Sequence, residues 1–313
     1  MTGVADAATA GTSPDTVPLL GLLLDVDGPI ASPVTRSINI PSITGDLVTL
    51  AAAGIPVVFN TGRSDEFLIR EVVAPLVAAG LPTGARVFAV CEKGAVWFAI
   101  TPEGAGEIRL DEGLAVPADY GRAIEGLVGE RYSQYVFYDH TKRAMVSVEQ
   151  RKDVAAPVYH AMRDSFDADA FAELQRFGLG ARWNETEAPD ANGRIDIRID
   201  PTIISTDIES VRLGKDLGAQ RAIEMLEPGG PLPRSWRTVG DSRSDYAMAD
   251  WLHEHGHDVA HVDVRPADGV PSKPYPVLTA GELIHDDAGA AFLRRWVAMV
   301  AGEARDDEGV GSN

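Results

Sequence analysis

Residues 19–30 read Leu19-Leu20-Gly21-Leu22-Leu23-Leu24-Asp25-Val26-Asp27-Gly28-Pro29-Ile30, and this stretch decides the fold. It begins as an apolar run too short for a helix, and it ends in two carboxylates one residue apart, followed by Gly-Pro. The pattern predicts a buried parallel strand that delivers its polar end to a loop. Ligands of open α/β sheets bind at the carboxyl edge of the strands, so Asp25 and Asp27 become candidate site residues. Taken alone, the pair could also be an ordinary strand-end cap.

The segments that follow predict a β-α-β unit. A helical pattern covers residues 44–53, and a second apolar run covers residues 55–59. Such a unit implies two parallel strands joined by a right-handed crossover. The second run ends in Asn60-Thr61-Gly62-Arg63-Ser64, so polar residues again follow a strand. We expect Ser64 to cap a helix over residues 65–79.

The middle of the chain has a different pattern. From about residue 114, short alternating segments replace the apolar runs. Alternation such as Met145-Val146-Ser147-Val148 predicts an antiparallel sheet with one wet face. We therefore expect a separate α+β domain, inserted into the first. Its expected elements are helices over 120–128 and 155–177 and strands over 135–139, 144–149, 181–184 and 195–199.

The first pattern returns near the end of the chain. A helix over 213–226 carries Lys215 near its start, and a strand over 236–239 ends in Gly240-Asp241-Ser242-Arg243-Ser244-Asp245. The predicted fold is α/β, with a Rossmann-like parallel-sheet core and an inserted α+β cap. The predicted boundaries are core at 16–112, cap at 113–203, core again at 204–302, and disordered tails at 1–15 and 303–313.

The acidic composition limits the partners of this 313-residue chain. Its formal net charge is −19, and we expect neither nucleic acid nor a membrane as partner, because both need basic patches. The longest apolar segment, residues 47–59, is interrupted by Gly54 and Pro56 and is shorter than the ~20 residues of a membrane span. Cys91 is the single cysteine, and no Lys or Arg precedes Arg36, unlike in a secretory signal. We expect a cytoplasmic protein and leave its oligomeric state open.

The polar residues at the strand ends suit phosphoryl transfer. A carboxylate can attack phosphorus to form an acyl phosphate, which water then opens. A second carboxylate can protonate the leaving alkoxide and later deprotonate the water. The hydroxyl of Thr61 and the ammonium of Lys215 would hold the transferring oxygens. Mg²⁺ prefers carboxylate and carbonyl oxygens, so Asp25, the Asp27 backbone carbonyl and Asp241 could bind it.

Four segments resemble, in order, the motifs of the haloacid dehalogenase superfamily. They are Asp25-Val26-Asp27-Gly28, Asn60-Thr61-Gly62-Arg63, Lys215 and Gly240-Asp241-Ser242-Arg243-Ser244-Asp245. Because it has a second aspartate, Asp27, the first of these segments resembles the motif of the phosphatase and phosphomutase branches rather than that of the dehalogenases. The resemblance implies these roles: Asp25 as nucleophile, Asp27 as general acid/base, Thr61, Gly62 and Lys215 as phosphate ligands, and Asp25, Asp27, Asp241 and Asp245 as ligands of Mg²⁺.

The position of the insert adds to the resemblance. It lies between the second and third motifs, where the Cof-like, sucrose-phosphatase and mannosyl-phosphoglycerate phosphatase groups and the phosphomannomutases carry their larger α+β cap. The segment 285–290 also resembles the late acidic-Gly loop of these groups. The resemblance implies a Mg²⁺-dependent phosphomonoester hydrolase acting on a small phosphorylated metabolite, a sugar phosphate or a phosphoglycerate conjugate. A phosphomutase and a non-catalytic phosphate-binding protein remain the alternatives.

Two departures from the family pattern, and the roles of several cap residues, can be assessed only with the structure. Pro29 stands where the family usually has Thr. The segment 201–214 is longer than the usual link to the lysine, so Arg212 is the alternative to Lys215. Candidates for contacts with the non-reacting end of the substrate are Arg63, Tyr138, His140, Lys142, Arg143 and Arg198. Each of the cap residues among them could equally be a solvated surface residue.

Overall fold

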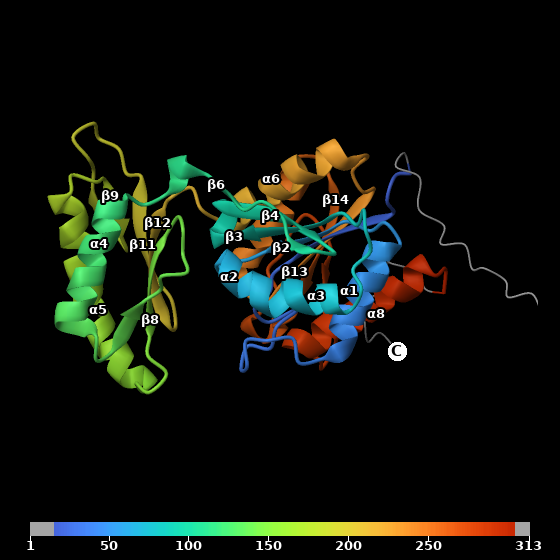
Figure 1. Cartoon of the computed structure of the whole chain (residues 1–313), viewed down its shortest axis with the longest axis horizontal. Coiled ribbons are helices and arrows are strands. Elements are labelled where there is room, and N and C mark those ends of the chain that lie inside the picture. The colour runs from blue at the N-terminus through green and yellow to red at the C-terminus, as the bar shows by residue number, and fades with distance from the viewer. Residues whose placement is uncertain (1–15, 304–313) are drawn as a thin grey trace, which may run out of the picture.

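A nine-stranded sheet forms the centre of the core in the computed structural model, which describes residues 16–303 (Figure 1). Its order is β15-β14-β13-β1-β2-β3-β4-β5, with β6 paired to β4. The strands from β15 to β3 in this order are parallel, and β4, β5 and β6 add an antiparallel edge. The strands are β1 (Leu20–Leu24), β2 (Val57–Asn60), β3 (Val87–Cys91), β4 (Val96–Thr101), β5 (Gly104–Ala105), β6 (Arg109–Leu110), β13 (Ser235–Gly240), β14 (Asp258–Asp263) and β15 (Val277–Leu278).

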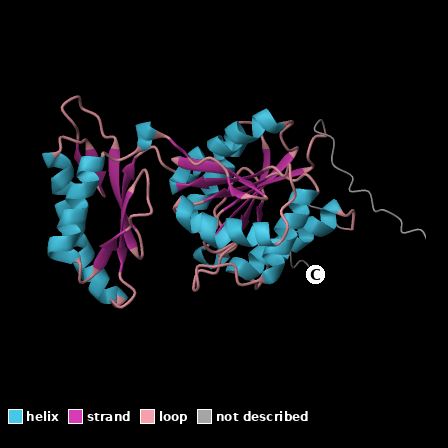
Figure 2. Ribbon diagram, in the orientation of Figure 1, coloured by secondary structure: helices cyan, strands magenta, loops and turns pink. Residues whose placement is uncertain are grey.

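Helices cover both faces of this sheet (Figure 2). One face packs against α1 (Pro41–Ala52), α2 (Asp65–Leu68), α3 (Ala74–Ala78) and α8 (His285–Val300), the other against α6 (Lys215–Leu226) and α7 (Tyr246–Glu254). Successive residues of β1 belong to opposite apolar clusters: Leu24 to the one with Phe292, Leu23 to the one with Met248. Side chains alternate along a strand, so burial on both faces requires the continuous apolar run seen in the sequence.

Strand β1 lies where the order of the strands reverses. It pairs with β13 on one side and with β2 on the other, so that Leu24 is opposite both Val239 and Phe59. Asp25 directly follows β1, Thr61 directly follows β2, and Asp241 directly follows β13. Ligands of open α/β sheets bind at such a reversal. The fold therefore brings these three polar strand ends to one edge of the sheet.

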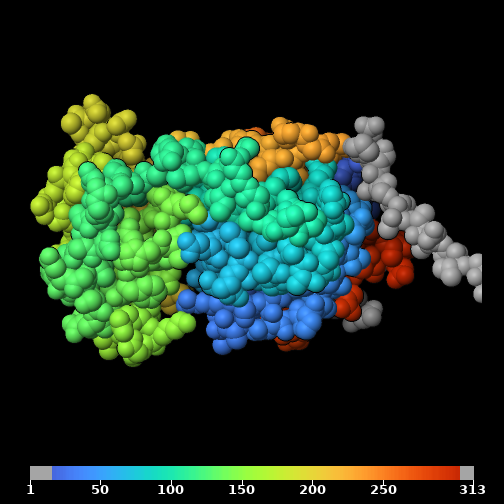
Figure 3. All heavy atoms as spheres, in the orientation of Figure 1, coloured from blue at the N-terminus to red at the C-terminus, as the bar shows by residue number. Residues whose placement is uncertain are grey.

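The cap is a six-stranded sheet with two long helices on one face (Figure 1). Figure 3 shows the cap, in green and yellow, packed against the core. Val146 and Val148 of β8 pack with Tyr120 of α4 and Phe166 of α5. We predicted that the other face would be wet, but it is turned toward the core, and Ser147 on it is buried. The elements are α4 (Ala118–Leu127), β7 (Val136–Tyr138), β8 (Val146–Gln150), α5 (Ala156–Arg176), β9 (Ala181–Trp183), β10 (Thr186–Ala188), β11 (Ile197–Pro201) and β12 (Ser205–Ser210).

Short helical segments complete the chain. The predicted helix over 65–79 is a composite, because a π-helical stretch η1 separates α2 from α3, and Ser64 caps it by accepting a hydrogen bond from the backbone N of Phe67. The segments are η1 (Ile69–Val73), η2 (Glu92–Gly94), η3 (Glu112–Leu114), η4 (Val128–Tyr132), η5 (Glu227–Gly229), η6 (Arg243–Asp245) and η7 (Pro266–Asp268). Within residues 16–303 no helix combines the length and apolarity of a membrane span.

One predicted domain boundary is wrong. We expected the core to resume at residue 204, but β12 pairs with β11 and β8 and so belongs to the cap sheet. The core resumes only with α6, which explains the long segment before Lys215. Strand β12 reads Ser-Thr-Asp-Ile-Glu-Ser, and a segment with one apolar residue gives no strand pattern. The expected tails at 1–15 and 303–313 lie outside the described residues, except for Glu303.

Candidate active site

Asp25 and Lys215 form an ion pair at the centre of the strand-end edge. The Nζ of Lys215 lies 2.7 Å from Asp25 Oδ1 and 2.6 Å from Asp245 Oδ1. It also donates a hydrogen bond to the backbone carbonyl of Asn60, while the Asn60 amide nitrogen donates to the carbonyl of Lys215. The alternative cation, Arg212, is exposed. The structure thus places Lys215, and not Arg212, beside Asp25.

Burial and mutual repulsion shape the charges of the cluster. Burial raises the pKa of Asp25 well above its ordinary value, Lys215 opposes this shift, and the neighbouring Asp245 and Asp27 add to it. Burial would also raise the pKa of Asp245, but the Lys215 ammonium and hydrogen bonds from Ser242 outweigh it and lower that pKa. Burial and the charge of Asp245 raise the pKa of Asp241. Burial and the repulsion among the clustered carboxylates thus raise the pKa values of Asp25 and Asp241 despite the nearby lysine.

Three of these carboxylates fit a divalent cation. One oxygen each of Asp25, Asp241 and Asp245 lies within 4.8 Å of the other two. Hard oxygen donors at such separations suit Mg²⁺. The loop that carries Asp241 packs closely on Gly28, where φ is +97° and a Cβ atom would stand 2.7 Å from the Cγ of Asp241. Asp245 accepts hydrogen bonds at Oδ2 from the backbone N of Asp241 and of Ser242, which fixes the loop.

Asp27 lies beside this group, and its side chain is engaged differently. Arg63 binds it with both ends of its guanidinium, Nε to Oδ2 at 2.8 Å and Nη2 to Oδ1 at 2.9 Å. The same guanidinium stacks on the ring of Phe67 at 4.8 Å. The Asp27 carboxylate does not join the three-carboxylate group of the described residues. A bidentate pair of this kind sets the orientation of a carboxylate.

Thr61 and Gly62 line the edge next to Asp25. Thr61 is buried, and its hydroxyl accepts a hydrogen bond from the backbone N of Arg63 at 3.1 Å. The carbonyl of Gly62 accepts a hydrogen bond from the Nζ of Lys142 at 2.6 Å. Lys142 comes from the loop between β7 and β8, so a cap residue reaches the strand-end edge of the core.

Comparison with known proteins bears on the fold. No family model and no curated protein matches the chain. Among solved structures, the C-terminal domain of C. albicans trehalose-6-phosphate phosphatase superposes with a TM-score of 0.58 at 12% identity, over 91% of this chain and 93% of that one. A Thermoplasma acidophilum protein gives 0.53 at 13% identity, over 89% and 98%. Plasmodium falciparum IMP-nucleotidase gives 0.51 at 10% identity, over 90% and 62%. The chain has the haloacid dehalogenase fold.

The haloacid dehalogenase fold with its inserted cap was predicted and is confirmed. Pro29, the departure in the first motif, contacts α8, because a Cβ on Gly289 would stand 1.9 Å from the carbonyl oxygen of Pro29. Only glycine therefore lets the helix approach the first motif this closely. The segment 285–290 forms the start of this helix, with the Nδ1 of His285 at 3.7 Å from Asp241 Oδ2. The start of α8 thus packs against the two loops that carry Pro29 and Asp241.

The predicted cap contacts divide into two groups. Arg143 binds Asp65 of α2 with Nε at 2.9 Å and Nη2 at 2.8 Å, and it joins cap to core. Arg198 binds Glu209 and the backbone carbonyls of Val211 and Leu213 within the returning segment. Tyr138 packs with the helix side of the cap sheet, and exposed His140 lies 3.6 Å from Glu125 of α4. Tyr138 and His140 therefore lie on the side of the cap sheet that faces away from the core.

The structural roles of Glu92 and Lys93 were not predicted from the sequence. Glu92 is buried, and its carboxylate accepts hydrogen bonds from the backbone N of Arg143, Ala144 and Met145, just before β8 of the cap sheet. Both residues have left-handed backbone conformations, with φ of +47° and +55°. Such conformations cost about 1–3 kcal/mol per residue. The contacts that Glu92 and Lys93 make with the cap offset this cost.

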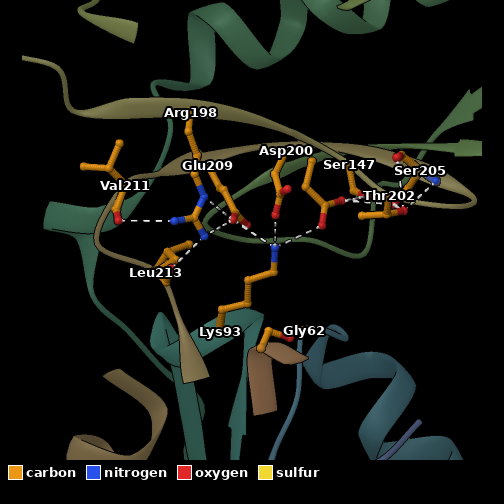
Figure 4. Close-up of polar contacts among 12 residues, drawn as sticks. Gly62, Lys93, Ser147, Arg198, Asp200, Thr202, Ser205, Glu209, Val211 and Leu213 are labelled. Atoms are coloured by element: carbon orange, nitrogen blue, oxygen red, sulfur yellow. Dashed lines mark hydrogen bonds and ion pairs between the residues drawn. The ribbon is translucent and has the colours of Figure 1, made fainter. Parts of the chain in front are cut away.

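Lys93 extends from the core into the cap sheet (Figure 4). Its Nζ lies 3.3 Å from Asp200, 3.4 Å from Asp207 and 2.9 Å from Glu209. Burial lowers the pKa of Lys93, but the three carboxylates outweigh it and raise the pKa above its ordinary value. The sequence carries these acids at alternate positions of β11 and β12, where they share the face turned to the core. These acids form a cluster only because β12 pairs with β11 in the cap sheet.

Proposed function

We propose that this protein is a Mg²⁺-dependent phosphomonoester hydrolase that works through an aspartyl phosphate. The observation that carries the proposal is the position of Asp25, which ends the central strand beside the ammonium of Lys215 and two further carboxylates. A carboxylate in this setting can attack phosphorus, and a buried ammonium beside it can hold the oxygens of the transferring group. The fold shared with solved phosphatases supports this reaction class.

The chain's own residues divide the work. Asp25 would attack phosphorus, and the leaving alkoxide would take a proton from Asp27, which later accepts one from water. Arg63 holds Asp27 in position through its two hydrogen bonds. Lys215 and the hydroxyl of Thr61 would bind the non-bridging oxygens, where negative charge spreads in the transition state. Asp25, Asp241 and Asp245 would hold Mg²⁺, which when bound neutralises phosphate charge and helps to orient the ester.

The cap would select the substrate. Its sheet faces the core, and Lys142 reaches the carbonyl of Gly62 beside Thr61. A cap in this place excludes bulk water during the reaction and contacts the leaving group. We propose a small phosphorylated metabolite as substrate, either a sugar phosphate or a phosphoglycerate conjugate.

Phosphate release tests the reaction. The purified protein is incubated with an aryl phosphate and with a panel of sugar phosphates and phosphoglycerates, with Mg²⁺ and again after chelation by EDTA. We expect inorganic phosphate to appear, to stop with EDTA and to return when Mg²⁺ is restored. Isomerised sugar phosphate without released phosphate would instead identify a phosphomutase. A lack of turnover across the whole panel would leave a non-catalytic phosphate-binding protein.

A further inference from the structure

A cleft of about 310 Å³ opens between cap and core, next to the residues described above. We call it the cap–core cleft. Its walls come from the loop between β1 and α1, from the start of α2 and η1, and from the loops on either side of β8. The cations that line it are Arg36, Arg63, Arg70, Lys142 and Lys152, and its acids are Glu71, Asp139 and Glu149. Cations thus outnumber acids here, although the whole chain has 47 acids against 28 basic residues.

The cleft borders the predicted reaction centre on the leaving-group side. Arg63 lines the cleft and also binds Asp27, the residue that would give its proton to the leaving group. Lys142 lines it and also touches Gly62, the neighbour of Thr61. A phosphate held between Asp25 and Thr61 would therefore direct its ester oxygen, and the group attached to it, toward this cleft.

The acids of the cleft are already engaged. Glu71 binds Arg70 at 2.7 Å, and Asp139 accepts hydrogen bonds from the backbone N and the hydroxyl of Thr141. Glu149 faces Arg36 at 3.9 Å. Burial raises the pKa of Glu149, while Arg63, Lys142 and Arg36 oppose this shift.

Two of the cations have no acid of their own. Lys142 donates to a backbone carbonyl, Lys152 is exposed, and neither forms an ion pair within residues 16–303. Lys142 acts electrostatically on Glu92 and Glu149 without pairing closely with either, and Lys152 adds a second ammonium group to the lining of the cleft. In a strongly acidic protein such a local excess attracts an anion.

We propose that the cap–core cleft binds a second anionic group, carried by the leaving group of the substrate. The proposal rests on the proposed function and narrows its substrate class to phosphomonoesters with a further carboxylate or phosphate. Lys142 and Lys152 would pair with that group, and Arg36 would add to the positive field. The carboxylates of the cap around Lys93 would repel an anion placed there, so the two parts of the cap face favour one orientation of the ester.

Matched pairs of esters test the proposal. Glycerol 3-phosphate and 3-phosphoglycerate differ by a hydroxymethyl group against a carboxylate, and fructose 6-phosphate and fructose 1,6-bisphosphate differ by a second phosphate. We expect kcat/KM to favour the more anionic member of at least one pair by on the order of 10- to 100-fold. The pair that shows the preference tells whether the second group is a carboxylate or a phosphate.

Variants locate the preference in the cleft. Lys142→Met and Lys152→Met together should reduce the preference in kcat/KM for the more anionic ester to about 3-fold or less, since charge-assisted hydrogen bonds from these lysines would supply that preference. Lys152 is exposed, so Lys152→Met alone gives a folded variant even if Lys142→Met disturbs the loop. Arg122→Gln on α4 removes a cation outside the cleft and should leave the preference unchanged. Equal kcat/KM within both pairs, or a preference that the lysine variants retain, would overturn the proposal.

Affinity measurements on an inactive variant distinguish a failure of the cleft proposal from a failure of the proposed function. Asp25→Asn prevents turnover by the proposed mechanism, and calorimetry then measures the affinity of the same four esters. Tighter binding of the more anionic esters, lost in the lysine variants, supports the cleft even if no ester is hydrolysed. Equal affinities of Asp25→Asn for all four esters would refute the cleft proposal and leave the hydrolase proposal to the phosphate-release test.

Discussion

Two clusters in this protein have similar compositions and different surroundings. Each consists of three carboxylates around one lysine. The core cluster is Asp25, Asp241 and Asp245 with Lys215, and the cap cluster is Asp200, Asp207 and Glu209 with Lys93. The core cluster lies at the strand-end edge of the core, whereas the cap cluster joins core to cap, and both lysines are largely buried, with side chains 9% and 18% exposed. Composition alone would not tell which of them carries chemistry.

The difference lies in the partners of the carboxylates and in whether their oxygens converge on one point. In the cap cluster, Arg198 also binds Glu209, and Ser147 donates to Asp207. In the core cluster, the carboxylate of Asp241 has His285 at 3.7 Å and Arg265 at 3.9 Å, and within residues 16–303 it accepts no hydrogen bond. Among the described residues, the three core carboxylates form the group whose oxygens converge within 4.8 Å. Converging oxygens indicate a cation site; in the cap cluster Oε2 of Glu209 also lacks a hydrogen bond, but among the described residues its acids form no such converging group.

The largest expected effect separates the clusters by activity. Asp25→Asn should lower phosphate release from an aryl phosphate by at least about 10³-fold, because an amide cannot form the acyl phosphate. The matched change in the cap cluster, Asp207→Asn, should retain most of the turnover, since Asp207 contacts Lys93 and Ser147. Steady-state phosphate release measures both. Turnover by Asp25→Asn within about ten-fold of the natural protein would refute the role of Asp25.

Removal of either lysine should destabilise the protein, and Mg²⁺ should distinguish the two. Lys215→Met and Lys93→Met each leave buried carboxylates without their ammonium, which costs about 3–5 kcal/mol of the free energy of unfolding. Mg²⁺ should recover part of that loss in Lys215→Met, because it would bind the core carboxylates. It should recover none in Lys93→Met. Urea unfolding with and without Mg²⁺ measures this, and an equal response of both variants would contradict the distinction.

A further buried carboxylate, that of Asp167, can be compared with the two clusters, because its hydrogen-bond partner is a hydroxyl and not a lysine. Asp167 of α5 accepts a hydrogen bond from Thr206 of β12, and burial raises its pKa to about 6. The folded state then binds this proton more tightly than the unfolded state, so the stabilisation is complete below about pH 4 and is lost as pH rises through 6.

Asp167→Asn tests this pH dependence. The substitution removes the cost of ionisation and should raise the free energy of unfolding at pH 7 by about 3 kcal/mol. Below pH 4 it should leave the free energy of unfolding unchanged. Urea unfolding across this pH range gives the difference between the two proteins, so other titrating groups cancel. A difference that does not vary with pH would contradict the raised pKa.

The smallest expected effect is the stabilisation by Mg²⁺. At about ten times its Kd, a cation that binds only the folded state adds about 1.4 kcal/mol to the free energy of unfolding. Asp241→Asn should lose this gain, and Asp200→Asn, the matched change in the cap cluster, should retain it. Thermal unfolding with and without Mg²⁺ measures the shift without any substrate. A shift that survives in Asp241→Asn would place the cation elsewhere.

The local patterns predicted the core well because they are short-range. An apolar run that ends in polar residues predicts both a buried strand and its polar end. Asp25, Thr61 and Asp241 could therefore be placed at the carboxyl edge of the core sheet from the sequence. Lys215 was also predicted as the phosphate-binding cation, with Arg212 as the alternative, and the ion pair with Asp25 favours Lys215. The resemblance in four ordered segments predicted the haloacid dehalogenase fold, and the superposition on solved structures confirms it.

The sequence by itself determined the parallel core and its polar strand ends, because alternation and apolar runs follow directly from the geometry of a strand. Tertiary structure alone decided that β12 belongs to the cap, since its polar side chains find their partners on distant segments. It also decided which acids surround Lys93 and which cations gather in the cap–core cleft. Residues such as Arg36 and Lys142 are far apart in the sequence, and only the packing of cap on core brings their charges to one place.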